Sequence, residues 1–258
     1  MSLAKEWLLP LARVLTKNDA KGPVYVLGDQ FTWFSYEYAF RKLKKTGLLR
    51  NALGPKALSS EQSGAVSFRT FMGMLGFEEF YDIDINGLAD LTWDLAQPLS
   101  PEFRGRAGLV IDIGTCEHIF NLPQSFSNIV ELLRPGGIVV HLSPFSWYNH
   151  GFVNFNPILF KEFYEHNHFR LLDHGLIWSP FDYTVRVIAG RFGLEPLLSR
   201  FSSITFILDD ENPTLTRFAN HVGLSARMMF LFAAERSMDN LPPSFPCQSI
   251  YRPTSPGR

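Results

Sequence analysis

The sequence has few of the features that mark secreted, membrane or nucleic-acid-binding proteins. It contains 2 cysteines, Cys116 and Cys247, too few for a disulfide framework and not arranged as a CxxC pair. Its 24 basic and 25 acidic residues leave a net charge of -1, which gives no electrostatic footprint for nucleic acid. It also lacks an apolar run long enough to span a bilayer. We therefore expect a cytoplasmic protein that binds neither nucleic acid nor membrane.

The N-terminal residues 1–22 do not form the hydrophobic centre of a signal peptide, because Lys5, Glu6, Pro10 and Arg13 interrupt their apolar stripe. We expect this segment to be a helix that docks on the domain. With 258 residues, 46% of them hydrophobic and 19% charged, the chain is long enough to bury a substantial core. We predict one domain over residues 1–258, with an irregular, proline-rich tail over 238–258. The sequence does not define the oligomeric state, and a homodimer is compatible with it.

Short apolar runs alternate with segments of helical spacing along the first two thirds of the chain. This alternation predicts an α/β fold with a mostly parallel sheet and helices on both faces. Two later strands, joined by a helical segment at 212–223, predict an antiparallel hairpin at the sheet edge, and residues 150–205 are expected to form a lid or substrate-side insertion. The predicted strands are 24–27, 79–85, 108–113, 138–145, 202–210 and 226–236, and the predicted helices are 35–47, 67–77, 123–134 and 156–169.

In an open parallel sheet, ligands bind beyond the carboxyl ends of the strands, at the point where the strand order reverses. The first strand is followed by "GDQ", residues Gly28, Asp29 and Gln30. Gly28 permits a sharp turn, and the amides beyond it are placed to face a ligand. The alternative is a turn glycine with no ligand.

Two acidic segments follow the second predicted strand. Asp82 and Asp84 are of the type that accepts hydrogen bonds from both hydroxyl groups of a ribose, although surface acids in a loop would show the same pattern. In "ADLTWDL", Asp94 lies between Trp93 and Leu95. This arrangement suits an adenine, whose faces the apolar side chains would hold and whose amine would donate to the carboxylate. The alternative is a short edge strand with a buried tryptophan.

The segment "DIGTCEHIFNLP" follows the strand at 108–113 and contains Asp112, Glu117 and His118. A histidine at this position is a candidate general base, although a neighbouring carboxylate or carbonyl could equally satisfy it structurally. Glu117 and His118 are also metal ligands by type, but no further ligand falls at a convincing spacing, so we expect no metal. After the next strand, where we expect His141 to be a core residue, Trp147, Tyr148 and His150 predict a polar-aromatic rim over a pocket.

Taken together, these segments resemble the class I S-adenosylmethionine-dependent methyltransferases. The "EH" after the strand at 108–113 and "LLRPGG" before the strand at 138–145 contribute most to the likeness. A bacterial group from polysaccharide and natural-product clusters is more similar still. Its members show "LGRQ", "DGGTLEHVFN" and "HGFYNFSP", where this chain has "LGDQ", "DIGTCEHIFN" and "HGFVNFNP". The likeness covers residues 23–170. It departs at the glycine-rich turn, reduced to Gly28, at Gly108 in place of an acid, and at Asp29 in place of arginine.

The resemblance implies a Rossmann-like, seven-stranded methyltransferase sheet whose last strand is antiparallel. It implies that S-adenosyl-L-methionine is the cofactor, with its methionine part at Gly28, Asp29 and Gln30, its ribose at Asp82, and its adenine at Asp94 with Trp93 or Leu95. Asp112 and His118 would flank the methyl group and the acceptor. The catalytic candidates are therefore His118 and His150 as bases and Asp112 as the residue that orients or stabilises one of them.

The resulting functional hypothesis is methyl transfer to a small-molecule acceptor in a natural-product or saccharide pathway. The acceptor atom, whether oxygen, nitrogen or carbon, stays open. The alternative is a methyltransferase-like protein that binds a partner or catalyses another pathway step, because a fold does not fix a function. A Rossmann-type oxidoreductase is disfavoured, because no GxGxxG follows the first strand.

Overall fold

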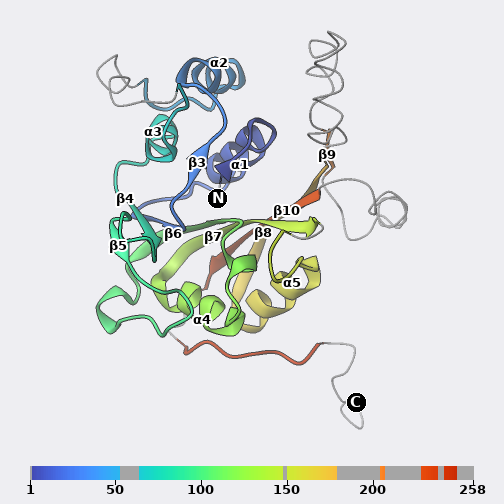
Figure 1. Cartoon of the computed structure of the whole chain (residues 1–258). Coiled ribbons are helices and arrows are strands. Elements are labelled where there is room, and N and C mark those ends of the chain that lie inside the picture. The colour runs from blue at the N-terminus through green and yellow to red at the C-terminus, as the bar shows by residue number, and fades with distance from the viewer. Residues whose placement is uncertain are drawn as a thin grey trace.

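A central β-sheet organises the chain, with helices on both of its faces (Figure 1). The computed structural model describes residues 2–52, 64–147, 150–178, 204–206, 228–237 and 241–248. The described strands of the large sheet are β2 (Val24–Leu27), β4 (Phe80–Asp84), β5 (Leu91–Thr92), β6 (Ala107–Ile113), β7 (Leu133–Ser146), β8 (Phe169–Trp178), β9 (Ile204–Phe206) and β10 (Met228–Arg236).

The strands of this sheet follow the order β5-β4-β2-β6-β7-β10-β8-β9. Strands β5, β4, β2, β6 and β7 are parallel to their neighbours, whereas β10 runs antiparallel between β7 and β8. The first seven strands in this order reproduce the methyltransferase sheet with its antiparallel last strand, and β9 adds an antiparallel edge. The predicted fold is therefore confirmed.

The two faces of the sheet are covered by different helices. One core cluster joins the sheet to α1 (Lys5–Lys17), α2 (Tyr36–Thr46) and α3 (Phe68–Met74), and the other joins it to α4 (Leu122–Leu132) and α5 (Pro157–His166). Side-chain alternation assigns the faces: Val24 and Val26 of β2 belong to the first cluster, and Tyr25 and Leu27 to the second. In Figure 1 the first helix layer lies above the sheet and the second below it.

Local sequence signals explain where several elements begin and end. The Ser35 hydroxyl accepts a hydrogen bond from the Tyr38 amide and caps α2, which ends at Gly47 with a φ of 71°. Asn156 caps α5 in the same way, with Pro157 in the first turn. Glycine is required at position 108 for a different reason. A Cβ there would lie 2.4 Å from the Lys21 carbonyl oxygen, so the backbone before β2 leaves no room for a side chain.

Three features differ from the expected arrangement. The segments 202–210 and 226–236 do not form a hairpin, because β8 lies between β9 and β10. Strand β8 itself falls in the predicted insertion at 150–205, where Asp173 and His174 interrupt its apolar pattern. A small two-stranded sheet, β1 (Ser2–Leu3) with β3 (Phe31–Thr32), ties the N-terminus to the segment after β2. The predicted helix at 212–223 lies outside the described residues, as do Tyr148 and Asn149.

The N-terminal segment contains α1, whose Leu8, Leu11 and Leu15 are buried against the sheet layer. The described part of the tail, residues 241–248, has no helix or strand and lies along α5, where Asn167 and Ser244 exchange hydrogen bonds. None of the helices in the described ranges has the length and apolar character needed to cross a membrane.

Candidate active site at the carboxyl ends of the strands

The strand order reverses between β2 and β6, because the chain moves outward from β2 to β4 and β5 and then returns to β6 on the other side. Gly28 follows β2 at this point with a φ of 78°, a conformation that favours glycine. A Cβ at Gly28 would lie 2.6 Å from Thr115 Oγ1. The turn is therefore both left-handed and tightly packed, which explains why its single glycine is required.

Gln30 lies buried beneath the same turn. Its Nε2 donates to the Leu27 carbonyl at 2.9 Å and to Thr115 Oγ1 at 3.2 Å, and the Thr115 hydroxyl also donates to Leu27. The other end of the amide, Gln30 Oε1, is buried and has no hydrogen-bond partner among the described residues. A buried acceptor without a donor is costly, so this oxygen marks a position at which a ligand donor would be stabilised.

The two acids of β4 have different surroundings. Asp84 ends the strand, and its Oδ2 accepts from the Asp29 amide at 2.8 Å, so its carboxylate adjoins the Gly28 turn. Asp82 lies two residues earlier and accepts from the Asp90 amide at 2.6 Å. Burial and the nearby Asp90 raise the pKa of Asp82. The structure thus places Asp84, and not the predicted Asp82, at the carboxyl end that faces the turn.

The predicted adenine segment follows β5. Trp93 is half-buried, and its amide donates to the Asp84 carbonyl at 3.1 Å. Asp94 is exposed and accepts from the Ala96 amide at 2.9 Å. Leu95 is buried in the core, where its carbonyl accepts from Asn128. The segment therefore joins the end of β4 to the helix layer, with Asp94 at the surface.

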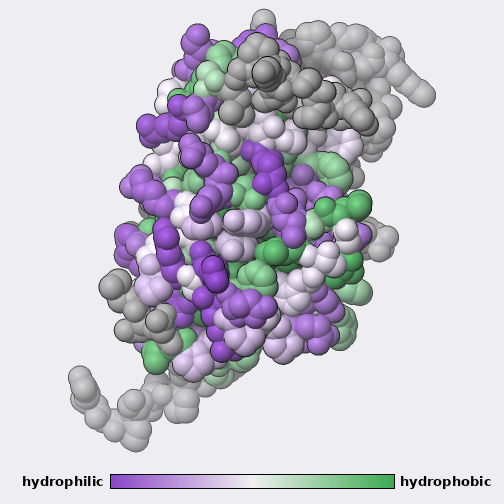
Figure 2. All heavy atoms as spheres, turned by 90° about the vertical axis from the view of Figure 1, so that its left-hand side faces the viewer, coloured by the Kyte–Doolittle hydropathy of each residue, from purple (hydrophilic) through white to green (hydrophobic). Residues whose placement is uncertain are grey.

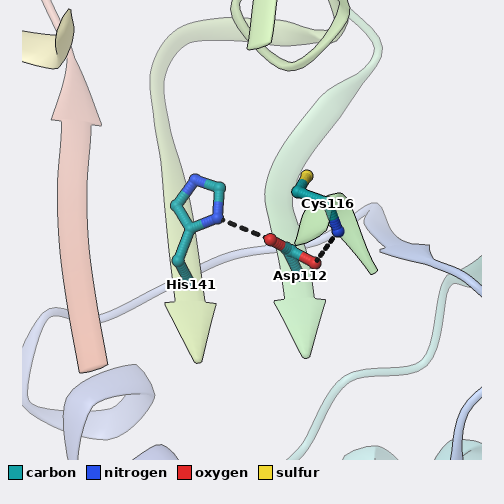
Figure 3. A group of neighbouring side chains, drawn as sticks. All are labelled: Asp112, Cys116 and His141. Atoms are coloured by element: carbon teal, nitrogen blue, oxygen red, sulfur yellow. Dashed lines mark hydrogen bonds and ion pairs between the residues drawn. The ribbon is translucent and has the colours of Figure 1, made fainter. Parts of the chain in front are cut away.

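Asp112 lies at the centre of a buried network (Figure 3). The register pairs Asp112 of β6 with His141 of β7, and His141 Nδ1 lies 2.8 Å from Asp112 Oδ2. Asp112 Oδ1 accepts from the amides of Thr115 and Cys116, and His141 Nε2 lies 2.6 Å from the Tyr164 hydroxyl. Burial opposes ionisation of Asp112, but these hydrogen bonds outweigh it and lower its pKa.

This placement changes the role predicted for Asp112. All the partners of its carboxylate lie within the core, so it does not contact either of the two candidate bases. His141 is a core residue, as the sequence predicts. The network fixes the loop that leaves β6, because Asp112 accepts from the Thr115 and Cys116 amides of that loop.

Five residues further along, Glu117 of the same loop forms a second acid–histidine pair with His150, which follows β7. Glu117 is 0% exposed, and neither of its carboxylate oxygens has a hydrogen-bond partner in the described part of the chain. His150 Nε2 lies 3.5 Å from Glu117 Oε1. Burial raises the pKa of Glu117 to about 7, an effect that His150 partly offsets. In the sequence, Glu117 falls in the segment expected to face the substrate and is a metal ligand by type, but nothing there indicates that its side chain is buried.

The two predicted bases meet beside Glu117. The rings of His118 and His150 lie edge to face with centroids 5.0 Å apart, and Trp147 stacks on His150 at 3.8 Å. Burial and the neighbouring His150 lower the pKa of His118, which favours the neutral imidazole near pH 7. Glu117, His118 and His150 also have ligand atoms within 4.8 Å of one another, as do Asp112, Cys116 and His141. In the second group, hydrogen bonds already occupy both Asp112 oxygens.

Hydrogen bonds link the loops at this edge into one rim. Asp29 and Asp84 join the loops after β2 and β4, Gln30 and Thr115 join those after β2 and β6, and the Phe152 amide donates to the Glu117 carbonyl. Large apolar side chains project from each loop: Phe31, Trp33, Ile85, Leu88, Phe120 and Phe152 are all exposed. On the side of the molecule that includes the β4–β5 edge, apolar surface interrupts a hydrophilic one (Figure 2).

Similarity to known proteins is found among solved structures, at low sequence identity. No protein-family model matches the chain, and no curated protein matches it. Among solved structures, a Bacillus halodurans protein provisionally named a methyltransferase aligns with a TM-score of 0.47 and 13% identity, over 88% of this chain and 98% of its own. The 1,6-didemethyltoxoflavin-N1-methyltransferase of Burkholderia thailandensis, solved with S-adenosylhomocysteine, gives a TM-score of 0.43 and 10% identity over 89% and 78%.

Proposed function

We propose that the protein transfers a methyl group from S-adenosylmethionine to a small-molecule acceptor, in a cytoplasmic pathway that builds a natural product or saccharide. The observation that carries the proposal is the turn at the reversal point of the sheet. There, a side chain at Gly28 would meet Thr115, and the buried side-chain oxygen of Gln30 has no hydrogen-bond donor among the described residues. Ligands of open α/β sheets bind at this position.

The residues at the turn fit the amino-acid end of the cofactor in one orientation. An ammonium group only donates hydrogen bonds, so it would satisfy Gln30 Oε1 and would be stabilised by the Asp29 carboxylate. The carboxylate of the cofactor would be repelled by Asp29. We therefore assign the ammonium, and not the carboxylate, to the side of the turn that carries Asp29 and Gln30.

The remaining parts of the cofactor would lie along the neighbouring loops. Asp84 replaces Asp82 as the ribose acceptor in this proposal, because Asp84 ends β4 beside the turn. Trp93 and Asp94 stay the adenine candidates, with the buried Leu95 as support beneath them. Asp112 is assigned to holding the β6 loop and not to contact with substrate.

The cofactor supplies a methyl group that is already activated as a sulfonium, so the protein has to align the acceptor and remove its proton. We assign His118 as the base, because its lowered pKa favours the neutral form that accepts a proton. Glu117 and His150 lie directly behind it. When Glu117 is ionised, its carboxylate stabilises positive charge on the adjoining imidazoles.

Calorimetric titration with S-adenosylhomocysteine tests the proposal. We expect micromolar binding, and we expect Asp84→Ala to weaken it by about 1–3 kcal/mol because a buried diol contact is lost. Asp82→Ala is the matched variant and should change the affinity less. If Asp82→Ala alone weakens binding, the ribose assignment returns to Asp82 while the function stands.

No detectable heat at millimolar ligand would contradict methyl transfer. That result would favour the second candidate, a methyltransferase-like protein without methyl transfer that binds a partner or catalyses another step. One observation supports this candidate: Thr115 packs against Gly28 and bonds to Leu27, so part of the turn is already occupied by the protein itself.

A further inference from the structure

A groove lies beside the candidate cofactor turn and is formed by segments that are distant in the sequence. Its volume is about 890 Å³, within the range of pockets that hold small ligands. Parallel pairing of β1 with β3 brings Ser2 and Lys5 to it. On the other side, the Val66 amide donates to the Phe34 carbonyl and positions the wall that contains Gly64 and Ala65. We call this feature the aromatic groove.

The lining of the aromatic groove is aromatic and basic. Phe31 and Trp33 are 62% and 68% exposed, which is unusual for side chains of this size without a ligand or partner. Tyr38 and Arg41 lie one turn apart on the same face of α2. The described lining comprises Ser2, Lys5, Phe31, Thr32, Trp33, Phe34, Ser35, Tyr38, Arg41, Gly64 and Ala65, with no acid among them.

Charge in the groove favours an anion. Lys5 lies over the Tyr38 ring, with Nζ 5.5 Å from its centroid, and Arg41 Nε donates to the Glu37 carbonyl at 3.3 Å. Glu6 and Glu37 lie outside the described lining but act on two of its residues. The pKa of Glu37 is lowered by hydrogen bonds to its own amide and to Ser35 and by the Arg41 charge, and the pKa of Tyr38 is raised by burial and by the Glu6 charge. Two cations beside exposed rings are suited to a flat apolar molecule with one acidic group.

The groove is also close to the proposed reaction centre. Phe31 is three residues from Gly28, so their Cα atoms are separated by at most about 11 Å. An acceptor of ordinary size could therefore rest in the groove and extend toward the rim that carries His118.

We propose that the aromatic groove is the acceptor site and that the acceptor is an aromatic or extended apolar molecule carrying one acidic group, a carboxylate or a phosphate. As an acceptor site it rests on the proposed methyl transfer, but its ligand preference does not. Trp33 and Phe31 hold the apolar part, and Arg41 with Lys5 binds the acidic group.

The test is calorimetric binding of three probes to the full chain: 2-naphthoate, 2-naphthyl phosphate and the neutral 2-naphthylmethanol. We expect at least one acidic probe to bind about tenfold more tightly than the alcohol, because a charge-assisted hydrogen bond is gained. The two acidic probes distinguish carboxylate from phosphate recognition. Equal affinity for acids and alcohol, or no binding of any probe at millimolar concentration, would overturn the proposal.

Matched variants locate the site. Arg41→Gln should weaken the acidic probe about tenfold and leave the alcohol unchanged, whereas Lys45→Gln, an exposed cation on the same helix outside the described lining, should change neither. Trp33→Ala should weaken all probes, and Phe245→Ala, an exposed ring on the tail, should change none. All four positions are exposed, so circular dichroism should show native folding. An Arg41→Gln variant that binds the acid normally would contradict the assignment.

Titration with S-adenosylhomocysteine in parallel separates the two proposals. Normal binding of S-adenosylhomocysteine without probe binding overturns the acceptor inference and leaves methyl transfer intact. Probe binding without S-adenosylhomocysteine binding contradicts methyl transfer and retains the groove as a site for acidic aromatic ligands.

Discussion

Two acid–histidine pairs differ in how their carboxylates are satisfied: Asp112 and His141 pair within β6 and β7, and Glu117 and His150 pair in the segments that follow these strands. Asp112 and Glu117 both have 0% exposure. Asp112 accepts from His141 and from two amides, and its pKa is lowered. Among the described residues, the Glu117 carboxylate has no hydrogen-bond partner and only His150 pairs with it, at 3.5 Å, and burial raises its pKa to about 7.

Burial alone therefore does not set the protonation state of these acids. At equal exposure, hydrogen bonds to the ionised form decide the direction of the shift. The hydrogen-bonded pair, Asp112 with His141, is called the satisfied pair and contributes to stability. The unsatisfied pair, Glu117 with His150, contains a carboxyl group that changes charge near neutral pH and adjoins the imidazoles of His118 and His150. Perturbed groups of this second kind cluster at functional sites, which is why we place the chemistry at Glu117, His118 and His150.

The largest expected effect is on the rate of methyl transfer. Replacing His118 with alanine should lower kcat by about 10²–10⁴-fold, because a positioned base is lost, with little change in the affinity for S-adenosylhomocysteine. The measurement is S-adenosylhomocysteine release with an accepted substrate. Cys116→Ser, in the satisfied network, is the comparison variant. Equal losses in both would mean that the two pairs are not functionally distinct.

The satisfied pair should dominate stability. Asp112→Ala leaves His141 and the Thr115 and Cys116 amides without their acceptor, and we expect it to reduce the free energy of unfolding by about 3–5 kcal/mol, as for breaking a buried ion pair. Urea unfolding measures this change. Asp94→Ala, at an exposed acid, should cost less than about 1 kcal/mol. A loss below that value at Asp112 would refute the structural role.

The unsatisfied pair should make the stability of the protein decrease as the pH rises. The pKa of Glu117 rises from 4.5 to about 7 on folding, so the folded chain holds a proton that the unfolded chain has lost between these values. Stability should therefore fall from pH 4.5 to 7, by about 3 kcal/mol at 1.36 kcal/mol per pKa unit, and then level off. Glu117→Gln should remove this decline, so the free energy of unfolding of the variant should increase relative to that of the wild type as the pH rises.

Asp112 is the control for the direction in which stability changes with pH. Because its folded pKa is lowered from 3.8, its contribution is present at neutral pH and is lost as the pH falls below the unfolded value. The difference in unfolding free energy between wild type and Asp112→Asn should therefore shrink in acid. If both variants respond to pH in the same direction, the contrast between the pairs is wrong.

A smaller effect tests the contact between the turn after β2 and the loop after β6. Gly28→Ala should destabilise the protein by about 1–2 kcal/mol, because the turn is left-handed and the new Cβ meets Thr115 Oγ1. The double variant Gly28→Ala, Thr115→Ala removes that contact and should lose less than the sum of the single changes in thermal unfolding. Strict additivity would show that Thr115 does not pack against the turn.

The sequence predicted the parts of the fold that depend on local signals. Apolar runs placed β2, β4, β6 and β7, and the caps Ser35 and Asn156 placed α2 and α5. Strand β8 was not predicted, because Asp173 and His174 break its alternation and it is defined by its pairing with β10 and β9. The false hairpin between 202–210 and 226–236 has the same origin, since pairing is not encoded locally.

The sequence predicted which loops carry the candidate site residues, but not the contacts that those residues make. Topology brings the loops after β2, β4 and β6 together, so Gly28, Gln30 and His118 fall at the expected edge. Which acid adjoins the turn depends on contacts between loops: Asp84 at the end of β4 accepts from the Asp29 amide, whereas Asp82 accepts from the Asp90 amide. Asp112 and Glu117 look alike in sequence, and only the register with His141 shows that the first is internal.

Hydrogen–deuterium exchange with and without S-adenosylhomocysteine tests most directly whether the cofactor binds at the reversal point of the sheet. We predict protection in three segments: residues 28–34, the loop at 84–94 and the loop at 114–119. Two results would contradict the account. One is slower exchange confined to other segments, such as residues 15–22 and 75–79, which line a separate groove. The other is no protection at saturating ligand.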